Sequence, residues 1–293
     1  MRVFKYKNIK LTKQYNKANF VTHSGTFHVD DVISTVFLSK IFKEINLIRI
    51  PSIENKNTNN KLVFDIGLGE FDHHQKNRNG KRENGIYYSS IGLLWKKYGK
   101  DYLKNIEVKN IDKVYEYMDK ELIQYIDATD NMQMEYLKSK TSPDFVKLCN
   151  PEWNENVTEE EGFIHALKLA DEFWNIYIKH AIAEVEAIEI IINKIEEVNS
   201  EQLPVFLTAD FNSDTDESCF NPLHQVMKDA RATAPVTDQE ATYNGYKTSG
   251  TRKLDHIFYD NGCVASIFQT LKENYGAPYI SDHYPVRTCF VLF

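Results

Sequence analysis

Short apolar segments with strand character alternate with helical segments between residues 19 and 126. Apolar runs predict strands at residues 19–22, 47–50 and 62–65. Helix-like spacing of apolar residues predicts helices at residues 30–45, 90–98, 111–126 and about 161–197. This order of elements is typical of an α/β domain with a largely parallel sheet. Ligands of such domains bind in loops at the carboxyl ends of the strands.

The chain changes character after Ser200, where strand-like runs outnumber helices. We predict strands at residues 204–212, 255–260, 263–269 and 285–293, and one helix at residues 221–228. A domain boundary is therefore expected near Asn199. The predicted parts are a basic tail at residues 1–18, an α/β domain at residues 19–199 and a partial segment at residues 200–293.

The composition favours a folded protein of the cell interior. Apolar residues make up 42% of the 293 residues, and no run approaches the ~20 apolar residues that span a bilayer. The four cysteines are scattered without a Cys-x-x-Cys pair, which is typical of a reducing compartment. We expect an intracellular protein without membrane contact, and leave cytoplasm, nucleus and mitochondrion open.

The net charge of −7 argues against a basic platform that holds nucleic acid by counterion release. The first 20 residues nevertheless carry six Lys or Arg and no acid. This segment has one Arg and no Ser, unlike a transit peptide, so we predict a solvated basic tail. If the substrate is a phosphodiester, metal ions must supply much of the positive charge.

His and Asp residues gather in four clusters, each at the end of a predicted element. Carboxylates and imidazoles without thiolates suit manganese or magnesium, and less often zinc. Two such ions ~3.5–4 Å apart can hold a phosphoryl group and generate the attacking hydroxide. The candidate residues are His23, His28, Asp30, Asp31, Asp65, Asp72, His73, His74, Asp127 and Asp130.

The segments HSGTFHVDD, FDIGLGEFDHHQ and IDATDN together resemble the DHH phosphoesterase superfamily. More narrowly, residues 19 to about 195 resemble the melanocyte-proliferating-gene-one-like family, also called metal-dependent protein hydrolases, which is associated with exonuclease activity on RNA. The resemblance implies a DHH-type, largely parallel sheet with flanking helices. Family members continue into a second domain that helps to hold the substrate, and nothing in this chain resembles that domain.

The resemblance also implies a role for each matching residue. The implied metal ligands are His23, His28, Asp30, Asp65 as the bridging carboxylate, His73, and Asp130 or the less favoured Asp127. Asp72 belongs to the DHH triplet, and His74 lies nearer the substrate. Asp31 is left open, because Asp30 matches the ligand position better and an Asp in the first helical turn is commonly a cap.

A second ordered set of polar residues lies in LTADFNSD, LDHIFYD and ISDHYPV. An Asp beside a His can orient the imidazole as a general acid or oxyanion stabiliser, and an Asp-x-Asn pair can position a water. Each motif alone is an ordinary turn or loop. The candidate catalytic residues are Asp210, Asn212, Asp255, Asp282 and His283.

These later motifs resemble the C-terminal part of the endonuclease/exonuclease/phosphatase family, which consists of magnesium-dependent phosphoesterases with two packed sheets. The resemblance covers about residues 186–293 and implies a partial α/β sandwich segment. The metal-binding Glu of that family comes from an N-terminal half that we do not find here. Trp174 matches an early family motif only as part of a dipeptide, and we expect it in the core. The chain looks like a chimera of two incomplete phosphoesterases.

Three function hypotheses follow. The first is a metal-dependent phosphodiesterase, an exonuclease on RNA or short oligonucleotides, acting at the N-terminal site. The second is a metal-binding scaffold without turnover, and the third places magnesium-dependent chemistry at Asp210 and His283. The N-terminal ligand set is complete and the C-terminal set lacks its Glu, so the first is favoured. The apolar C-terminal strands lack their second sheet, and we expect them to dock on the N-terminal domain or to form a homodimer.

Overall fold

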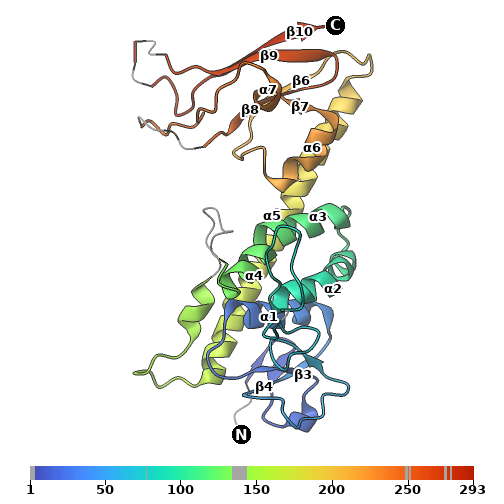
Figure 1. Ribbon diagram of the computed structural model, residues 1–293, viewed down its shortest axis with the longest axis vertical. Coiled ribbons are helices and arrows are strands. Elements are labelled where there is room, and N and C mark those ends of the chain that lie inside the picture. Colours follow the sequence, from blue (N-terminus) through green and yellow to red (C-terminus); the bar gives the residue numbers. More distant parts are fainter. Residues whose placement is uncertain are drawn as a thin grey trace. The chain divides into compact units, whose positions relative to one another are not determined.

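The computed structural model describes residues 4–76, 78–133, 144–247, 250, 252–273, 276–277 and 279–293 (Figure 1). The chain folds into two compact units: unit 1 is Met1–Ala183 and unit 2 is Glu184–Phe293. The point of division lies inside α5 (Glu159–Val198), the long helix expected at residues 161–197. No helix in the described part of the chain is long and apolar enough to span a membrane.

Unit 1 is built on a five-stranded, mostly parallel sheet in the order β1-β2-β4-β3-β5. The central strands β3 (Phe20–His23) and β4 (Ile45–Ile50) are parallel, with His23 opposite Ile50. Strand β5 (Leu62–Val63) runs parallel to β3 on its other side. The carboxyl ends of these three strands therefore meet at one edge of the sheet. The predicted α/β class with a largely parallel sheet and flanking helices is confirmed.

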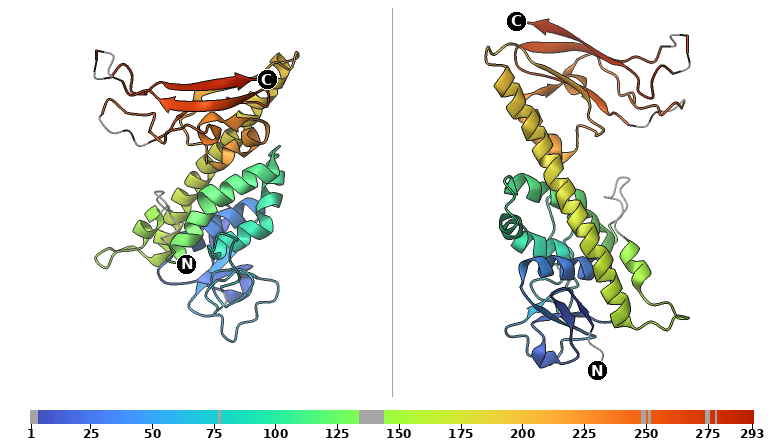
Figure 2. Two further views of the ribbon diagram at one scale, coloured as in Figure 1. Left: turned by 45° about the horizontal axis from the view of Figure 1, so that its top comes forward. Right: turned by 180° about the vertical axis from the view of Figure 1, so that it is seen from behind.

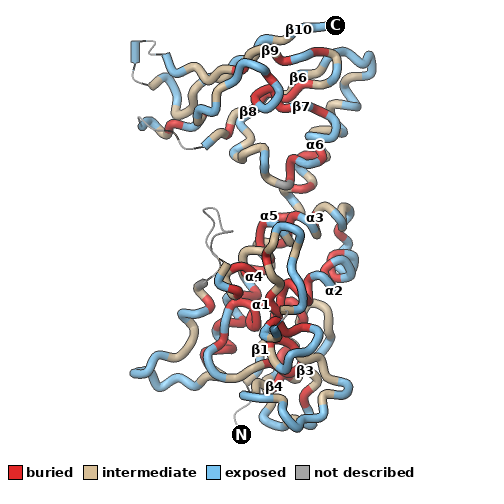
Figure 3. The backbone as a smooth tube through the Cα atoms, in the orientation of Figure 1, coloured by how far each residue is buried: buried red, intermediate tan, exposed pale blue. Residues whose placement is uncertain are grey.

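Helices supply most of the core of unit 1 (Figure 3). They are α1 (Val29–Ile41), α2 (Ser90–Asn105), α3 (Ile111–Met118), a π-helical turn at Asp119–Ile123, α4 (Gln124–Asp130) and the first part of α5, with short 3-10 turns at Tyr15–Lys17 and Asp144–Cys149. Phe37 of α1 packs its ring 5.5 Å from Trp95 and 5.3 Å from Trp174. Trp174 is fully buried, as expected for a core residue.

The predicted solvated tail at residues 1–18 is wrong for the described part of that segment. Strands β1 (Lys5–Tyr6) and β2 (Ile9–Leu11) extend the sheet, and β2 pairs in parallel with β4. Ile9 is buried, and the sheet supplies hydrogen-bond partners for its backbone. Strands of two and three residues are too short to give a periodic pattern. The high Lys content of this segment therefore led to the prediction of a solvated tail.

The predicted helix at residues 30–45 ends earlier, at Ile41. The side-chain amide of Asn8 donates to the carbonyl oxygens of Ser39 and Phe42, at 2.8 Å each. These bonds satisfy carbonyl groups that have no partner at the end of a helix. Ile45 therefore begins β4 rather than ending α1. The helix predicted at residues 111–126 instead runs through the π-helical turn to Asp130.

Unit 2 consists of the last part of α5, antiparallel strands and short helices. Strands β6 (Phe206–Asp210), β8 (Asp255–Tyr259) and β7 (Lys228–Asp229) form one sheet, and β9 (Cys263–Thr270) pairs with β10 (Val286–Leu292) (Figure 2). A 3-10 turn at Ser218–Phe220 leads into α6 (Asn221–Val226), and α7 (Ala230–Thr233) follows β7. Buried Tyr259 and Phe268 belong to its core, whereas Phe206 and Leu292 are exposed.

Candidate metal centre

His23, the last residue of β3, begins the site in unit 1. Its Nε2 lies 3.1 Å from Asp65 Oδ2 and 3.2 Å from Asp31 Oδ2. Asp65 follows β5 and adopts a φ of 54°, a left-handed conformation that is uncommon outside glycine and is often found at functional sites. The ends of two neighbouring parallel strands thus bring an imidazole and a carboxylate together, as the sequence predicts for His23 and Asp65.

The first turn of α1 adds two buried carboxylates, Asp30 and Asp31. Asp31 Oδ1 accepts the backbone N–H of His28 at 2.9 Å and so caps the helix, while Asp31 Oδ2 faces His23. Asp31, left open from sequence, therefore caps α1 with one oxygen and belongs to the cluster with the other. Asp30 groups instead with His28 and Asp130, whose potential ligand atoms lie within 4.8 Å of one another.

The DHH triplet lies on the loop after β5. His73 Nε2 is 2.9 Å from Asp130 Oδ2, and His73 Nδ1 is 3.9 Å from Asp30 Oδ2 and 4.0 Å from Asp65 Oδ1. His74 is the exposed member, at 58%, and its Nδ1 is 2.6 Å from Oδ1 of buried Asp72. Asp72 Oδ2 also accepts the backbone N–H of Leu68 at 2.6 Å. Asp72, itself held by Leu68, therefore fixes the orientation of the His74 ring from the buried side.

Asp127 does not join the cluster. Its Oδ1 accepts the backbone N–H and the hydroxyl of Ser89, at 2.9 and 2.7 Å, and its Oδ2 accepts from Arg82 at 2.6 Å. A Cβ at Gly92 would lie 2.1 Å from Asp127 Oδ2, so only glycine fits there. Asp127 anchors the start of α2, and Asp130 is the residue of IDATDN that contacts the His/Asp cluster, through His73.

The donor set fits divalent cations. Asp30 Oδ1, Asp65 Oδ1 and His73 Nδ1 are buried and have no hydrogen-bond partner among the described residues. Buried polar atoms normally have one, so these three atoms are free to act as ligands of a cation. Asp65 belongs to two groups of potential ligand atoms, one with His23 and Asp31 and one with His73 and His74. Carboxylate oxygen and imidazole nitrogen are suitable ligands for manganese or magnesium.

The electrostatics of the cluster are those of crowded carboxylates. Burial, and then the nearby charge of Asp65, raise the pKa of Asp30 well above its ordinary value. Burial also raises the pKa of Asp65, against the opposing hydrogen bond from His23. Burial lowers the pKa of His23, but hydrogen bonds to Asp31 and Asp65 outweigh it and raise that pKa to about 10. Bound protons reduce the negative charge of these carboxylates, and a bound cation would neutralise that charge in their place.

Three residues that the sequence motifs did not single out hold the loop between His23 and His28. Arg49 donates to the Gly25 carbonyl at 2.9 Å and to Glu159 Oε1 at 2.5 Å, and the same Glu159 oxygen accepts the Gly25 N–H at 2.9 Å. Asn150 exchanges two hydrogen bonds of 3.0 Å with the backbone of Phe27. Asn150 directly precedes PEWNE, and Glu159 begins α5, so only their position in the fold reveals this role.

The second predicted set meets in unit 2. Asp210 and Asp255 are opposite each other on antiparallel β6 and β8. His283 Nδ1 is 2.7 Å from Asp255 Oδ2, and its Nε2 is 3.7 Å from Asp210 Oδ2. Burial lowers the pKa of His283, but the hydrogen bond to Asp255 helps to raise it overall. Potential ligand atoms of Asp210, Asp255 and His283 lie within 4.8 Å of one another.

Asn212 and Asp282 lie outside this group of three. The backbone N–H of Asn212 donates to Asp210 Oδ1 at 2.8 Å in a tight turn. Asp282 accepts the backbone N–H groups of Asn244 and Gly245 through its carbonyl oxygen. The imidazole of His283 is therefore held by Asp255 and not by its sequence neighbour Asp282.

The fold and the buried His/Asp cluster at the carboxyl ends of parallel strands define an α/β unit with a candidate metal centre. Residues 19–217 match the MYG1_exonuc family, described as an uncharacterised protein family (UPF0160), and the chain belongs to this family. The family resemblance of the N-terminal part is thereby confirmed.

The chain spans about half the length of the curated relatives it matches. The MYG1 protein YER156C of Saccharomyces cerevisiae is 30% identical over 196 residues, covering 57% of this chain and 56% of the relative. The mouse MYG1 exonuclease is 27% identical over 180 residues, covering 52% and 47%.

Solved structures overlap this chain only in part. An endonuclease/exonuclease/phosphatase from Bacteroides vulgatus is 27% identical, with 38% of this chain and 44% of that chain covered and a TM-score of 0.34. The mannosyl-6-phosphatase Bt3783 of Bacteroides thetaiotaomicron is 25% identical, with 38% and 46% covered and a TM-score of 0.33. At such scores the proposed relation of the C-terminal segment to that family, and the chimera it implies, stay predictions.

Proposed function

We propose that this protein is a metal-dependent phosphodiester hydrolase, an exonuclease on RNA or short oligonucleotides, and that it acts at the cluster in unit 1. The sharing of Asp65 between two groups of potential ligand atoms carries the proposal. One carboxylate placed between two such groups is suited to bridge a pair of ions. The names of the mammalian relatives, which are MYG1 exonucleases, support the same class of reaction.

Two divalent ions at this site would polarise the phosphoryl oxygens and make water a better nucleophile. The side chains that would hold them are His23, His28, Asp30, Asp31, Asp65, His73 and Asp130. His74 belongs to the same group as Asp65 and His73, but its Nδ1 lies 2.6 Å from buried Asp72, and we assign its exposed imidazole to the substrate. The hydrogen bond that His74 donates to Asp72 raises the pKa of His74. A charged His74 would donate a proton or hydrogen bond to the substrate oxygen that gains negative charge.

The test is hydrolysis of an end-labelled RNA oligonucleotide with manganese, with magnesium or with a chelator. Turnover by the intact protein that is lost with chelator and in His73→Ala supports the proposal. A folded protein that binds manganese without cleaving any oligonucleotide would instead be a metal-binding scaffold.

A second candidate site is the group of Asp210, Asp255 and His283 in unit 2. The 2.7 Å contact of Asp255 with His283 favours it, because such a contact orients an imidazole for acid catalysis. We rank it lower because Asp210 is 38% exposed, whereas Asp65 of the first site is 2% exposed, and because the group has a single imidazole. If His283→Ala abolishes hydrolysis and His73→Ala spares it, the second site is the active one.

A further inference from the structure

A cavity of about 440 Å³ in unit 1 runs along β4. Its wall includes β4 from Leu47 to Ile50, and Ile50 lies opposite His23 in the sheet. Ser24, the residue after His23, also lines the cavity. The cavity therefore reaches the carboxyl end of β3, where the cluster begins.

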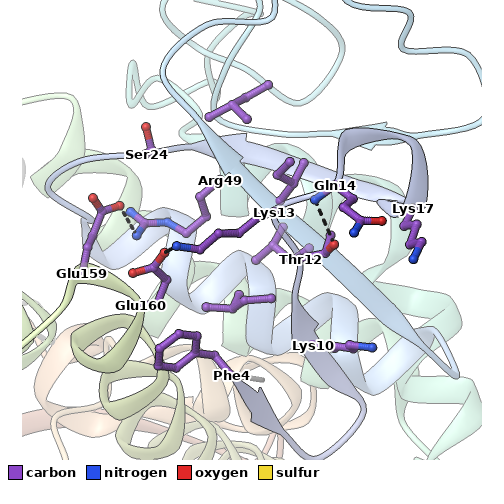
Figure 4. A pocket seen from close by; sticks show the side chains of 14 residues that line it. Phe4, Lys10, Thr12, Lys13, Gln14, Lys17, Ser24, Arg49, Glu159 and Glu160 are labelled. Atoms are coloured by element: carbon purple, nitrogen blue, oxygen red, sulfur yellow. Dashed lines mark hydrogen bonds and ion pairs between the residues drawn. The ribbon is translucent and has the colours of Figure 1, made fainter. Parts of the chain in front are cut away.

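Cationic side chains outnumber acidic ones around this cavity. The charged residues are Lys10, Lys13, Lys17, Arg49, Glu159 and Glu160. Both glutamates are already paired, Glu159 with Arg49 at 2.5 Å and Glu160 with Lys13 at 3.1 Å. Figure 4 shows these two pairs on one side and Lys10 and Lys17 on the other. Two lysines are thus left to attract an anion.

Lys10 and Lys17 are both exposed, and among the described residues neither has an ion pair. The rest of the wall includes the apolar side chains of Phe4, Leu11 and Leu47. A nucleotide complements both features, since its anionic phosphate can pair with the lysines and the apolar face of its base can stack on a ring.

We propose that the cavity binds one nucleotide of a single-stranded substrate, with its phosphate on Lys10 and Lys17 and its base against the apolar wall. This rests on the function proposed above and adds a substrate-binding subsite to it. A chain with a net charge of −7 needs a local cationic surface to hold a polyanion. The first 20 residues hold six Lys or Arg and no acid, and three of these lysines line the cavity.

The test is binding of a fluorescein-labelled single-stranded RNA to the chelator-treated protein over a series of salt concentrations. Lys10→Gln/Lys17→Gln removes two phosphate contacts, so the slope of log Kobs against log salt becomes shallower by about 1.4, or ~0.7 for each contact. Lys43→Gln/Lys109→Gln, which changes two exposed lysines that do not line the cavity, leaves the slope unchanged. An unchanged slope in the first variant, with an intact circular dichroism spectrum, overturns the inference.

Competition separates a nucleotide site from a general anion site. Adenosine monophosphate displaces the labelled RNA at concentrations where inorganic phosphate does not, if the base contributes. Equal displacement by the two overturns the assignment of a nucleotide. Because chelator prevents turnover, a shallower slope in a protein that never hydrolyses RNA with manganese would keep the subsite and refute the proposed function. Hydrolysis of RNA with manganese, together with an unchanged slope in the first variant, would keep the proposed function and refute the subsite.

Discussion

Arg82→Met should lower the free energy of unfolding of unit 1 by about 3–5 kcal/mol, because it leaves a buried carboxylate without its counter-charge. Asp127 is fully buried, and the Arg82 side chain is only 8% exposed. Arg82 donates to Asp127 at 2.6 Å and to Asp119 at 2.6 and 2.9 Å. Burial raises the pKa of Asp127, and Arg82 is the first of the groups that oppose that rise.

Tryptophan fluorescence during denaturant or thermal unfolding measures this loss. The three tryptophans, Trp95, Trp153 and Trp174, all belong to unit 1, so the signal is specific to it. For a unit of this size, each kcal/mol corresponds to a shift in Tm of about 2–4 °C, which gives a decrease of about 6–20 °C.

Two variants control the experiment. Arg78→Met removes one hydrogen bond of 2.9 Å to Asn131 from a partly exposed arginine, and should cost about 1 kcal/mol. Arg82→Met/Asp127→Asn should recover part of the loss, since it removes the unpaired charge. If Arg82→Met costs no more than Arg78→Met, the ion pair of Arg82 with Asp127 does not stabilise unit 1.

Four further outcomes are expected. Calorimetry with manganese should give about two sites per chain, and fewer in His73→Ala. Asp65→Ala should reduce hydrolysis more than Asp31→Ala, which additionally loses a helix cap worth ~1 kcal/mol; equal turnover in the two variants would contradict the bridging role. The raised pKa of His23, about 10, means that charged His23 stabilises the metal-free protein fully below pH ~6.5, and that this stability is lost as pH rises through about 10. The difference in unfolding free energy between the wild type and His23→Gln should therefore shrink over that interval. His283→Ala should leave hydrolysis nearly unchanged, as measured on the same labelled RNA.

Elements with a strong pattern were predictable from the sequence. The long helix at Glu159–Val198 and the strand at Phe20–His23 lie within two residues of their predicted bounds, because each has a clear periodic or apolar run. The end of α1 was not predictable, since it depends on the side chain of Asn8 across the fold. Local patterns determine that an element exists, and tertiary contacts determine where it stops.

The candidate site was also predictable only in part from the sequence. Strand ends carrying His and Asp predicted that His23, Asp65 and His73 would meet, because parallel strands end at one edge. The sequence could not separate Asp127 from Asp130, which are one helical turn apart. Their partners decide it: Arg82 and Ser89 engage Asp127, whereas His73 lies 2.9 Å from Asp130.

Arg49 connects the two parts of the proposed substrate path. It lines the cavity with its neighbours on β4, and it fixes Gly25 in the loop that follows His23. Its guanidinium lies 4.3 Å from the centre of the Phe163 ring. Burial lowers the pKa of Arg49, and the charge of Asp31 in the cluster opposes that shift. A strand of RNA held at Lys10 and Lys17 would therefore reach the metal cluster along β4, past a wall kept in place by Arg49 and Glu159. The lysines of the cavity would then hold the same substrate molecule on which the His/Asp cluster acts.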